Sequence, residues 1–238
     1  MTVVTPHEGE VVTRKSVAEL LDTDEPAWPM VQEWLASAGD RVEVLPRDER
    51  QAEQTLQQLQ VTVRSPLGAI AYETGGLLID SGWLRVLGSG SERMSGSLRS
   101  WNDGTVDTFG LSGKALLVAH DAVGGFFALN GGAFDGDPGN VHYLAPDTLE
   151  WDDLELPYSD FLSWALTGDL DAYYADNRWP DWREQVAHLS GDQGILVYPP
   201  LWAAEGGERA RRSKNVVPVT ELWGLTHEWR NQLGLTAG

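Results

Sequence analysis

The sequence predicts a single α+β domain, with a central, mainly antiparallel sheet of about five to six strands flanked by helices. Short apolar runs separated by Gly- and Asp-rich turns fill the middle of the chain, which is typical of an antiparallel meander. Segments with apolar residues at helical spacing stand on both sides of these runs. The length of 238 residues and the 42% of hydrophobic residues suit one globular domain spanning 1–238.

The first part of the chain, residues 14–60, is expected to be mainly helical, after a flexible or edge-forming segment over 1–13. Ser16 and Glu19 have the spacing of a capping box, which indicates a short helix to Leu21. The other elements expected here are a helix over 26–38, a strand over 41–46, a helix from the Asp48 cap to about Leu59, and a strand at Val61 and Val63.

Residues 61–200 are expected to hold the sheet. Its strands are predicted at 77–80, 83–87, 114–119, 125–129, 141–144 and 195–198, with turns at 130–132 and 135–139 and helices over 157–166 and 182–189. Residues 203–215, with Arg209, Arg211, Arg212 and Lys214, are expected to form an exposed loop, and residues 219–234 a final helix.

The charge is strongly acidic and unevenly distributed. The formal net charge is −19, and residues 121–181 hold 13 acidic residues and one basic residue, Arg178. A field of this sign repels nucleic-acid phosphates and attracts a basic protein partner. The competing explanation is that the acidic charge serves only to keep the protein soluble.

Composition excludes several classes of site. The chain has no cysteine, so disulfides, cysteine-based zinc sites and thiol nucleophiles are ruled out. No run approaches the roughly 18 to 20 apolar residues of a membrane helix, so no membrane association is expected. The first ten residues carry Glu8 and Glu10 and no basic, apolar leader, so the cytoplasm is the expected location.

Three segments resemble a bacterial family known as domain of unknown function 2625: Gly75–Gly90, His120–Gly132 and Tyr158–Trp164. The resemblance covers roughly residues 17–202, and it implies no particular activity. A more distant resemblance, to the SUKH-type fold of many bacterial toxin-immunity proteins, rests on the pattern of Val118–Gly124, Phe126–Leu129, Val141–Tyr143 and Ser159–Leu166. It implies a protein partner such as a toxin.

His120 and Asp121 are the pair most like a catalytic site, as a general base beside a carboxylate at the end of a strand. Neighbours in a strand point to opposite faces, however. The alternative interpretation is that Asp121 binds the turn at Gly124 and Gly125 while His120 is packed or at the surface. No familiar catalytic motif is present, so no catalytic residue is assigned beyond these two candidates.

The spacing of the candidate ligands matches no complete metal-binding or anion-binding motif. His142 with His120 and Asp135 or Asp137 would form a metal site only if folding brought them together, so we predict no metal and no cofactor. The Asp135–Asn140 segment lacks the distal Glu of a calcium loop and is interpreted as a turn. Gly88–Ser91 and Ser95–Ser97 resemble phosphate-binding loops without matching a full motif, and are either turns or an anion site near Arg85, Arg93 and Arg99.

Aromatic residues cluster inside the acidic region, a composition that favours an interface with a basic protein. We therefore predict a non-catalytic protein-binding module. The alternatives are a small-ligand-binding protein or hydrolase near His120 and Asp121, and a structural homo-oligomer. The predicted binding residues are Trp164, Asp169, Asp171, Tyr173, Tyr174, Asp176 and Trp179.

Overall fold

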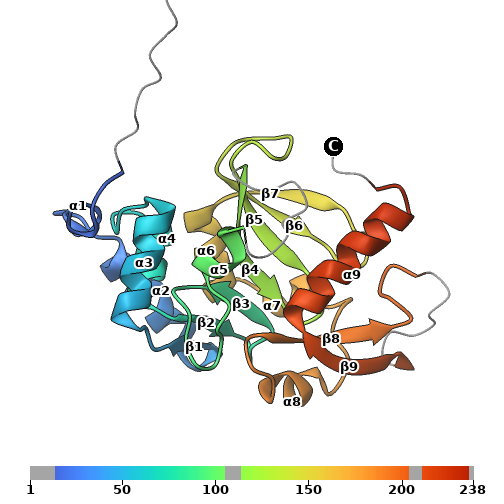
Figure 1. Ribbon diagram of the computed structural model, residues 1–238. Coiled ribbons are helices and arrows are strands. Elements are labelled where there is room, and N and C mark those ends of the chain that lie inside the picture. The colour runs from blue at the N-terminus through green and yellow to red at the C-terminus, as the bar shows by residue number, and fades with distance from the viewer. Residues whose placement is uncertain (1–13, 105–113, 204–210, 236–238) are drawn as a thin grey trace, which may run out of the picture.

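The computed structural model describes residues 14–104, 114–203 and 211–235, and its centre is a seven-stranded antiparallel sheet (Figure 1). The strands lie in the sheet in the order in which they occur along the chain. The predicted antiparallel sheet is confirmed, but it has seven strands and not five or six. The strands are β1 (Val42–Leu45), β2 (Gly76–Ile79), β3 (Leu84–Leu87), β4 (Ala115–Asp121), β5 (Phe126–Asn130), β6 (Asn140–Leu144) and β7 (Trp151–Pro157).

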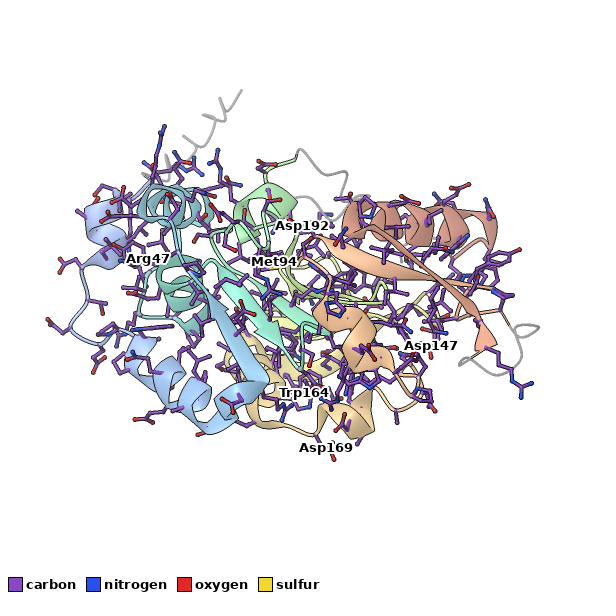
Figure 2. The ribbon with its side chains drawn as sticks, turned by 90° about the horizontal axis from the view of Figure 1, so that it is seen from below. Arg47, Met94, Asp147, Trp164, Asp169 and Asp192 are labelled. Atoms are coloured by element: carbon purple, nitrogen blue, oxygen red, sulfur yellow. The ribbon has the colours of Figure 1, made fainter. Side chains whose placement is uncertain are left out.

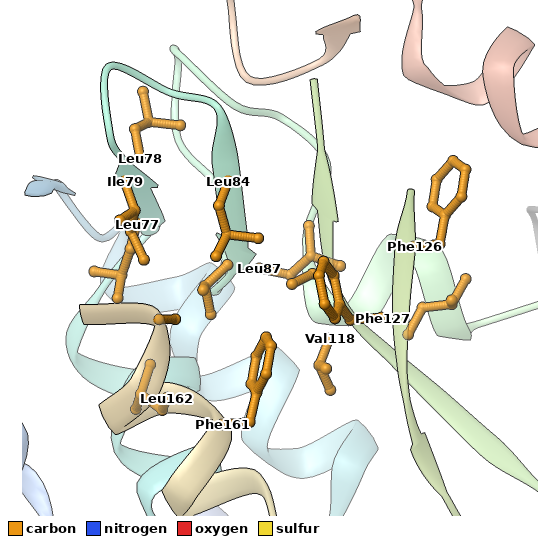
Figure 3. Packing of buried hydrophobic residues seen from close by; sticks show 14 of the residues in the cluster. Leu77, Leu78, Ile79, Leu84, Leu87, Val118, Phe126, Phe127, Phe161 and Leu162 are labelled. Carbon is orange, nitrogen blue, oxygen red and sulfur yellow. The ribbon is translucent and has the colours of Figure 1, made fainter. Parts of the chain in front are cut away.

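Helices cover both faces of this sheet. Consecutive residues of a strand point to opposite faces, and Figure 3 shows Phe127 directed toward Phe161 while Phe126 points the other way. The rings of Phe127 and Phe161, in α6 (Tyr158–Thr167), lie 5.1 Å apart. On the other face, Phe126 packs edge-on against Trp223 of α9 (Val219–Gln232) at 4.7 Å. Burying each apolar side chain of this size contributes about 1.5 to 3 kcal/mol.

The N-terminal helices form a group beside β1 and β2 and extend the α6 layer, since α2 and α4 both contact α6 (Figure 1). Among the described residues, none of the helices is long and apolar enough to cross a membrane. The remaining helices are α1 (Val17–Leu21), α2 (Trp28–Ala38), α3 (Glu49–Leu59), α4 (Pro66–Glu73), α5 (Leu98–Asn102), α7 (Leu170–Tyr173) and α8 (Trp182–Ala187), with a 3-10 turn, η1, at Gly39–Arg41.

A second, two-stranded sheet joins the C-terminal part to the rest. Strand β8 (Gln193–Tyr198) pairs antiparallel with β9 (Ser213–Pro218), and α9 follows directly. The amide of Ile195 donates to the carbonyl of Ala122 at 2.7 Å, so the hairpin is attached to the turn between β4 and β5. This attachment places α9 over the Phe126 face of the large sheet.

Two helix starts agree with their predicted caps. Ser16 and Glu19 form the reciprocal capping box of α1, in which the amide of Ser16 donates to Oε2 of Glu19 at 2.8 Å. Asp48 caps α3 by accepting the amide of Gln51 at 2.9 Å. Caps of this kind typically stabilise by about 1 kcal/mol each.

Other predictions were wrong or incomplete. Val61 and Val63 form no strand, because the backbone of Val63 bonds to Leu20 and Ala27 of the N-terminal helical part. β7 was not among the predicted strands. The predicted loop over 203–215 in fact includes the beginning of β9 and the buried Arg212. Residues 1–13 and 204–210 lie outside the described residues.

Candidate functional site

Asp80 is the centre of a charged cluster at one end of the sheet. It follows β2 in a left-handed conformation with φ of 52°, and its carboxylate is 4% exposed. Its Oδ2 lies 2.6 Å from Nη2 of Arg178, and its Oδ1 lies 2.6 Å from Nη1 of Arg183. Asp171 pairs with the same two arginines, at 2.6 Å from Arg178 and 3.1 Å from Arg183. Two carboxylates and two guanidinium groups thus form one charge-balanced network.

Arg178 is the buried member of the network, with a side chain 6% exposed. Its guanidinium group lies over Trp182 at 3.9 Å, Trp83 at 4.9 Å and Tyr174 at 5.2 Å. Burial lowers the pKa of Arg178, and the charge of Asp80 opposes that effect. Attraction to aromatic faces is strongest where the cation is desolvated, so this cage stabilises the charge that burial penalises.

A cavity of about 330 Å³ opens beside the network. Its lining combines positive and negative groups, since Arg41 and Arg183 face Asp80, Asp169 and Asp171. Arg41 also donates to the carbonyl of Gly168 at 2.9 Å, which ties the start of α7 to η1. The lining charges largely cancel, so the cavity favours neither cations nor anions strongly.

The structure separates the seven predicted binding residues into two groups. Tyr174 and Trp179 are buried, at 0% and 5% exposure, and pack around Trp83 as core. The other five lie at the surface of the α6–α7 region, where Figure 2 shows Trp164 and Asp169 together at one edge of the molecule. These five are Trp164, Asp169, Asp171, Tyr173 and Asp176.

Tyr173 is the most exposed aromatic ring of this group, at 38%. Its ring lies 4.8 Å from Trp164 and 5.9 Å from Tyr143. Burial raises the pKa of Tyr173, and the neighbouring carboxylates Asp121, Asp152 and Asp147 raise it further. Asp147 and Asp152, at the β6–β7 end of the sheet, are therefore close enough to act on the ring of Tyr173. We call Trp164, Tyr173, Asp147, Asp152, Asp169, Asp171 and Asp176 together the acidic surface.

Asp121 is fully buried and organises the turn between β4 and β5. Its Oδ1 accepts the amides of Val123 at 2.9 Å and Gly125 at 2.8 Å, and its Oδ2 accepts the hydroxyl of Tyr143 at 2.7 Å. A side chain at position 125 would overlap Oδ2 of Asp121 and the Tyr143 hydroxyl, so only glycine fits there. This is the turn-binding role that the sequence offered as the alternative to catalysis.

His120 points to the opposite face of the sheet and is 1% exposed. Its ring packs at 6.1 Å from Trp101 and 6.2 Å from Phe126, and burial lowers its pKa to about 3. The positive charge of Arg85 acts in the same direction. A neutral imidazole enclosed by aromatic rings has no access to a substrate, which argues against the predicted hydrolase site.

The groups considered for a metal site are held by other contacts. Nε2 of His142 lies 3.1 Å from the carbonyl of Asp135, and its ring stacks on Phe134 at 4.6 Å. β5 separates the strands that carry His120 and His142. Within the described ranges, no set of three or more His, Asp or Glu side chains is arranged to hold a metal ion.

The Ser95–Ser97 loop does bind an anion, and the anion belongs to the protein itself. The carboxylate of Asp192 accepts the amide of Ser95 at 2.7 Å, the amide of Gly96 at 2.7 Å and the hydroxyl of Ser95 at 2.9 Å. Figure 2 shows Asp192 beside Met94, at the base of this loop. Of the arginines considered for an external anion, Arg85 is buried and Arg93 pairs with Glu43.

Sequence reasoning missed the Asp80 network. One signal could have indicated it: Arg178 is the only basic residue among 13 acidic ones over 121–181. An isolated cation in such a segment is well placed to be an internal counter-ion. The identity of its partner Asp80 depends on the tertiary fold, since about a hundred residues separate the two.

Comparison with known proteins supports the resemblance seen in the sequence. The family model described as protein of unknown function DUF2625 matches residues 17–222. The chain belongs to the DUF2625 family. An uncharacterized Escherichia coli K12 protein, YbfG, is 44% identical over 216 residues, covering 91% of this chain and 97% of YbfG.

A second DUF2625 relative is an uncharacterized Haemophilus influenzae protein, 38% identical over 188 residues. That match covers 79% of this chain and 82% of the relative. No solved structure matches. The DUF2625 resemblance is thus confirmed, whereas the SUKH-type one stays a prediction.

Proposed function

We propose that this DUF2625 protein is a non-catalytic binding module that engages a basic protein through the acidic surface. The observation that carries the proposal is the setting of Tyr173, a partly exposed ring that packs against Trp164 and lies near the carboxylates of Asp147 and Asp152. Interface energy concentrates in aromatic anchors of this kind, and complementary charge raises the rate of association.

The electrostatics of Asp152 agree with a cationic partner. Burial raises the pKa of Asp152, and its acidic neighbours Glu150 and Asp147 raise it further. A lysine or arginine from a partner would relieve this repulsion between like charges. The salt-bridged network beneath the surface would hold α7 in place during binding, because Asp171 is fixed by Arg178 and Arg183. The SUKH-type pattern adds toxin domains to the partners worth testing.

The direct test is calorimetric titration against toxin domains encoded beside the gene. For a partner that binds, Tyr173→Ala should weaken affinity by about 30-fold, which corresponds to roughly 2 kcal/mol for an aromatic anchor. Tyr198→Ala is the matched control, because Tyr198 is 64% exposed on β8, outside the acidic surface.

Charge reversal tests the second part of the proposal. Asp152→Lys with Asp176→Lys should slow association and reduce its salt dependence, whereas Asp24→Lys with Glu33→Lys, which makes the same charge change on exposed N-terminal residues, should have a smaller effect. Asp171 is avoided, because its replacement would also break two ion pairs. Absence of binding to any of these domains, or equal losses in test and control variants, would contradict the proposal.

A further inference from the structure

The two Gly/Ser segments that sequence analysis singled out meet at one cavity. Gly88–Ser91 follows β3 and Ser95–Ser97 precedes α5, and the amide of Leu98 donates to the carbonyl of Gly88 at 2.9 Å to hold them together. Helix α3 closes the third side. The resulting cavity has a volume of about 180 Å³ and is separate from the acidic surface. It is lined by Gln51, Thr55, Ser89, Ser95, Ser97, Arg99, Ser100 and Asp103.

The hydroxyl groups of this cavity can accept hydrogen bonds from a ligand, because their own hydrogens are already donated within the protein. The Thr55 hydroxyl donates to the carbonyl of Gln51 at 2.8 Å, and the Ser89 hydroxyl donates to the carbonyl of Thr74 at 2.8 Å. The Ser95 hydroxyl donates to Asp192. A hydroxyl has one hydrogen and two lone pairs, so each of these oxygens has used its hydrogen and keeps accepting capacity. Thr55 and Ser89 are buried, at 1% and 2% exposure, which fixes their orientation.

Arg99 supplies donors at the same cavity. One of its terminal nitrogens donates to Oε1 of Gln54 at 2.5 Å. A guanidinium group carries five N–H donors, so others are available for a ligand. The carboxylate of Asp103 lies in the same lining and balances the positive charge of Arg99, so charge selects neither an ammonium ligand nor an anion. A carboxylate or sulfate has no hydrogen to donate to Thr55 or Ser89. The loop amides at Ser95 and Gly96, which could bind an oxyanion such as hydrogen phosphate, are already occupied by Asp192.

A neutral ligand with several hydroxyl groups can donate to the oxygens of Thr55 and Ser89 and accept from Arg99, because each hydroxyl both donates and accepts. The volume lies below the range of about 300 to 1,000 Å³ of drug-sized sites, so the ligand is small. We propose that the cavity between α3, the Gly88–Ser97 segment and α5 binds a small neutral polyol, no larger than a monosaccharide. Its hydroxyls donate to Thr55 and Ser89 and accept from Arg99.

Saturation-transfer NMR and calorimetry on the full chain test this proposal. The probes are glycerol, ribose, glucose, galactose, mannose and myo-inositol, with inorganic phosphate and ethylamine as probes of the rejected classes. We expect saturable binding of at least one polyol, and no competition from phosphate or ethylamine. Failure of all six polyols to bind would overturn the proposal, and so would binding of phosphate or ethylamine that depends on Thr55.

Thr55→Val and Ser89→Ala locate the site. Each should weaken polyol binding by about tenfold, the effect of losing one hydrogen bond. Thr167→Val is a matched control, since Thr167 also donates to the carbonyl four residues earlier, at 2.8 Å, but lies outside this cavity. Amide spectra of all variants establish that they remain folded. Polyol binding that none of the cavity variants weakens would place the ligand elsewhere and refute the assignment.

Discussion

The buried environment of His120 makes the stability of the protein depend on pH. Its pKa is lowered to about 3 by burial and by Arg85, whereas a histidine in an unfolded chain titrates near 6.5. Below pH 6.5 the unfolded chain therefore binds a proton that the folded chain does not. The stability contributed by neutral His120 is complete above pH 6.5 and is lost progressively as the pH falls toward 3.

We predict that His120→Phe removes this part of the pH dependence. Phe preserves the ring contacts with Trp101 and Phe126 and does not titrate. Between pH 6.5 and pH 4, the wild-type chain should lose about 3 kcal/mol of unfolding free energy relative to the variant. Urea unfolding across this pH range measures the difference, with exposed His188→Gln as the control expected to follow the wild type. Parallel curves for wild type and His120→Phe would contradict the assigned environment.

Some features of single residues in the candidate site were predictable from the sequence and others were not. The binding of the turn by Asp121 was one of two predicted interpretations, because a carboxylate ahead of two glycines has backbone amides within reach. Tyr174 and Trp179 were assigned to the surface although they are buried. An aromatic side chain in such a cluster faces the core only if another part of the chain packs over it. Tyr174 is covered by Trp83, which lies far away in the sequence.

Among the elements, strands with apolar cores were predictable and charged strands were not. β2 to β6 carry the apolar runs from which they were predicted, whereas β7 contains Asp152, Asp153 and Glu155 and resembles a turn in sequence. β7 lies at the edge of the sheet, where charged side chains are tolerated and discourage pairing with other chains. β9, with Lys214 and Asn215, was missed for the same reason. The edge strands β1 and β8 carry apolar residues and were predictable, whereas β7 and β9 are rich in charged or polar residues and were not.

Three of the hydrogen bonds that attach the Ser95–Ser97 loop to the start of β8 are accepted by one carboxylate, that of Asp192. We predict that Asp192→Asn destabilises the protein by about 1.5 to 3 kcal/mol, because an amide replaces one of the two oxygens and weakens three charge-assisted hydrogen bonds. Hydrogen exchange at the amides of Ser95 and Gly96 should accelerate. Asp181→Asn, an exposed position in contact with Gln185, serves as the control. Unchanged exchange at both amides would show that the carboxylate does not hold the loop.

At the level of the whole molecule, four of the large exposed hydrophobic side chains among the described residues are dispersed: Met30, Val44, Tyr173 and Leu233 lie on or beside four different elements. The two most exposed, Tyr198 and Val216, lie on the paired strands β8 and β9. Isolated apolar residues at the surface are normal and do not mark an oligomer interface. The overall α+β class was predictable because alternation and turn chemistry act locally, whereas the placement of α9 over the sheet depends on long-range packing.

The chain-ordered sheet has a consequence for how the protein is assembled during synthesis. Each strand can pair with its predecessor as it leaves the ribosome, so the sheet needs no later segment to complete it. Arg85 is different, because its guanidinium donates at 2.5 Å to the carbonyl of Gln193, 108 residues further along. We therefore predict that amides of β2 to β5 gain protection before those of β8 in pulse-labelled refolding. Until β8 is in place, the guanidinium of Arg85 lacks the carbonyl of Gln193 that accepts its hydrogen bond, so docking of the C-terminal hairpin is the step that completes the domain.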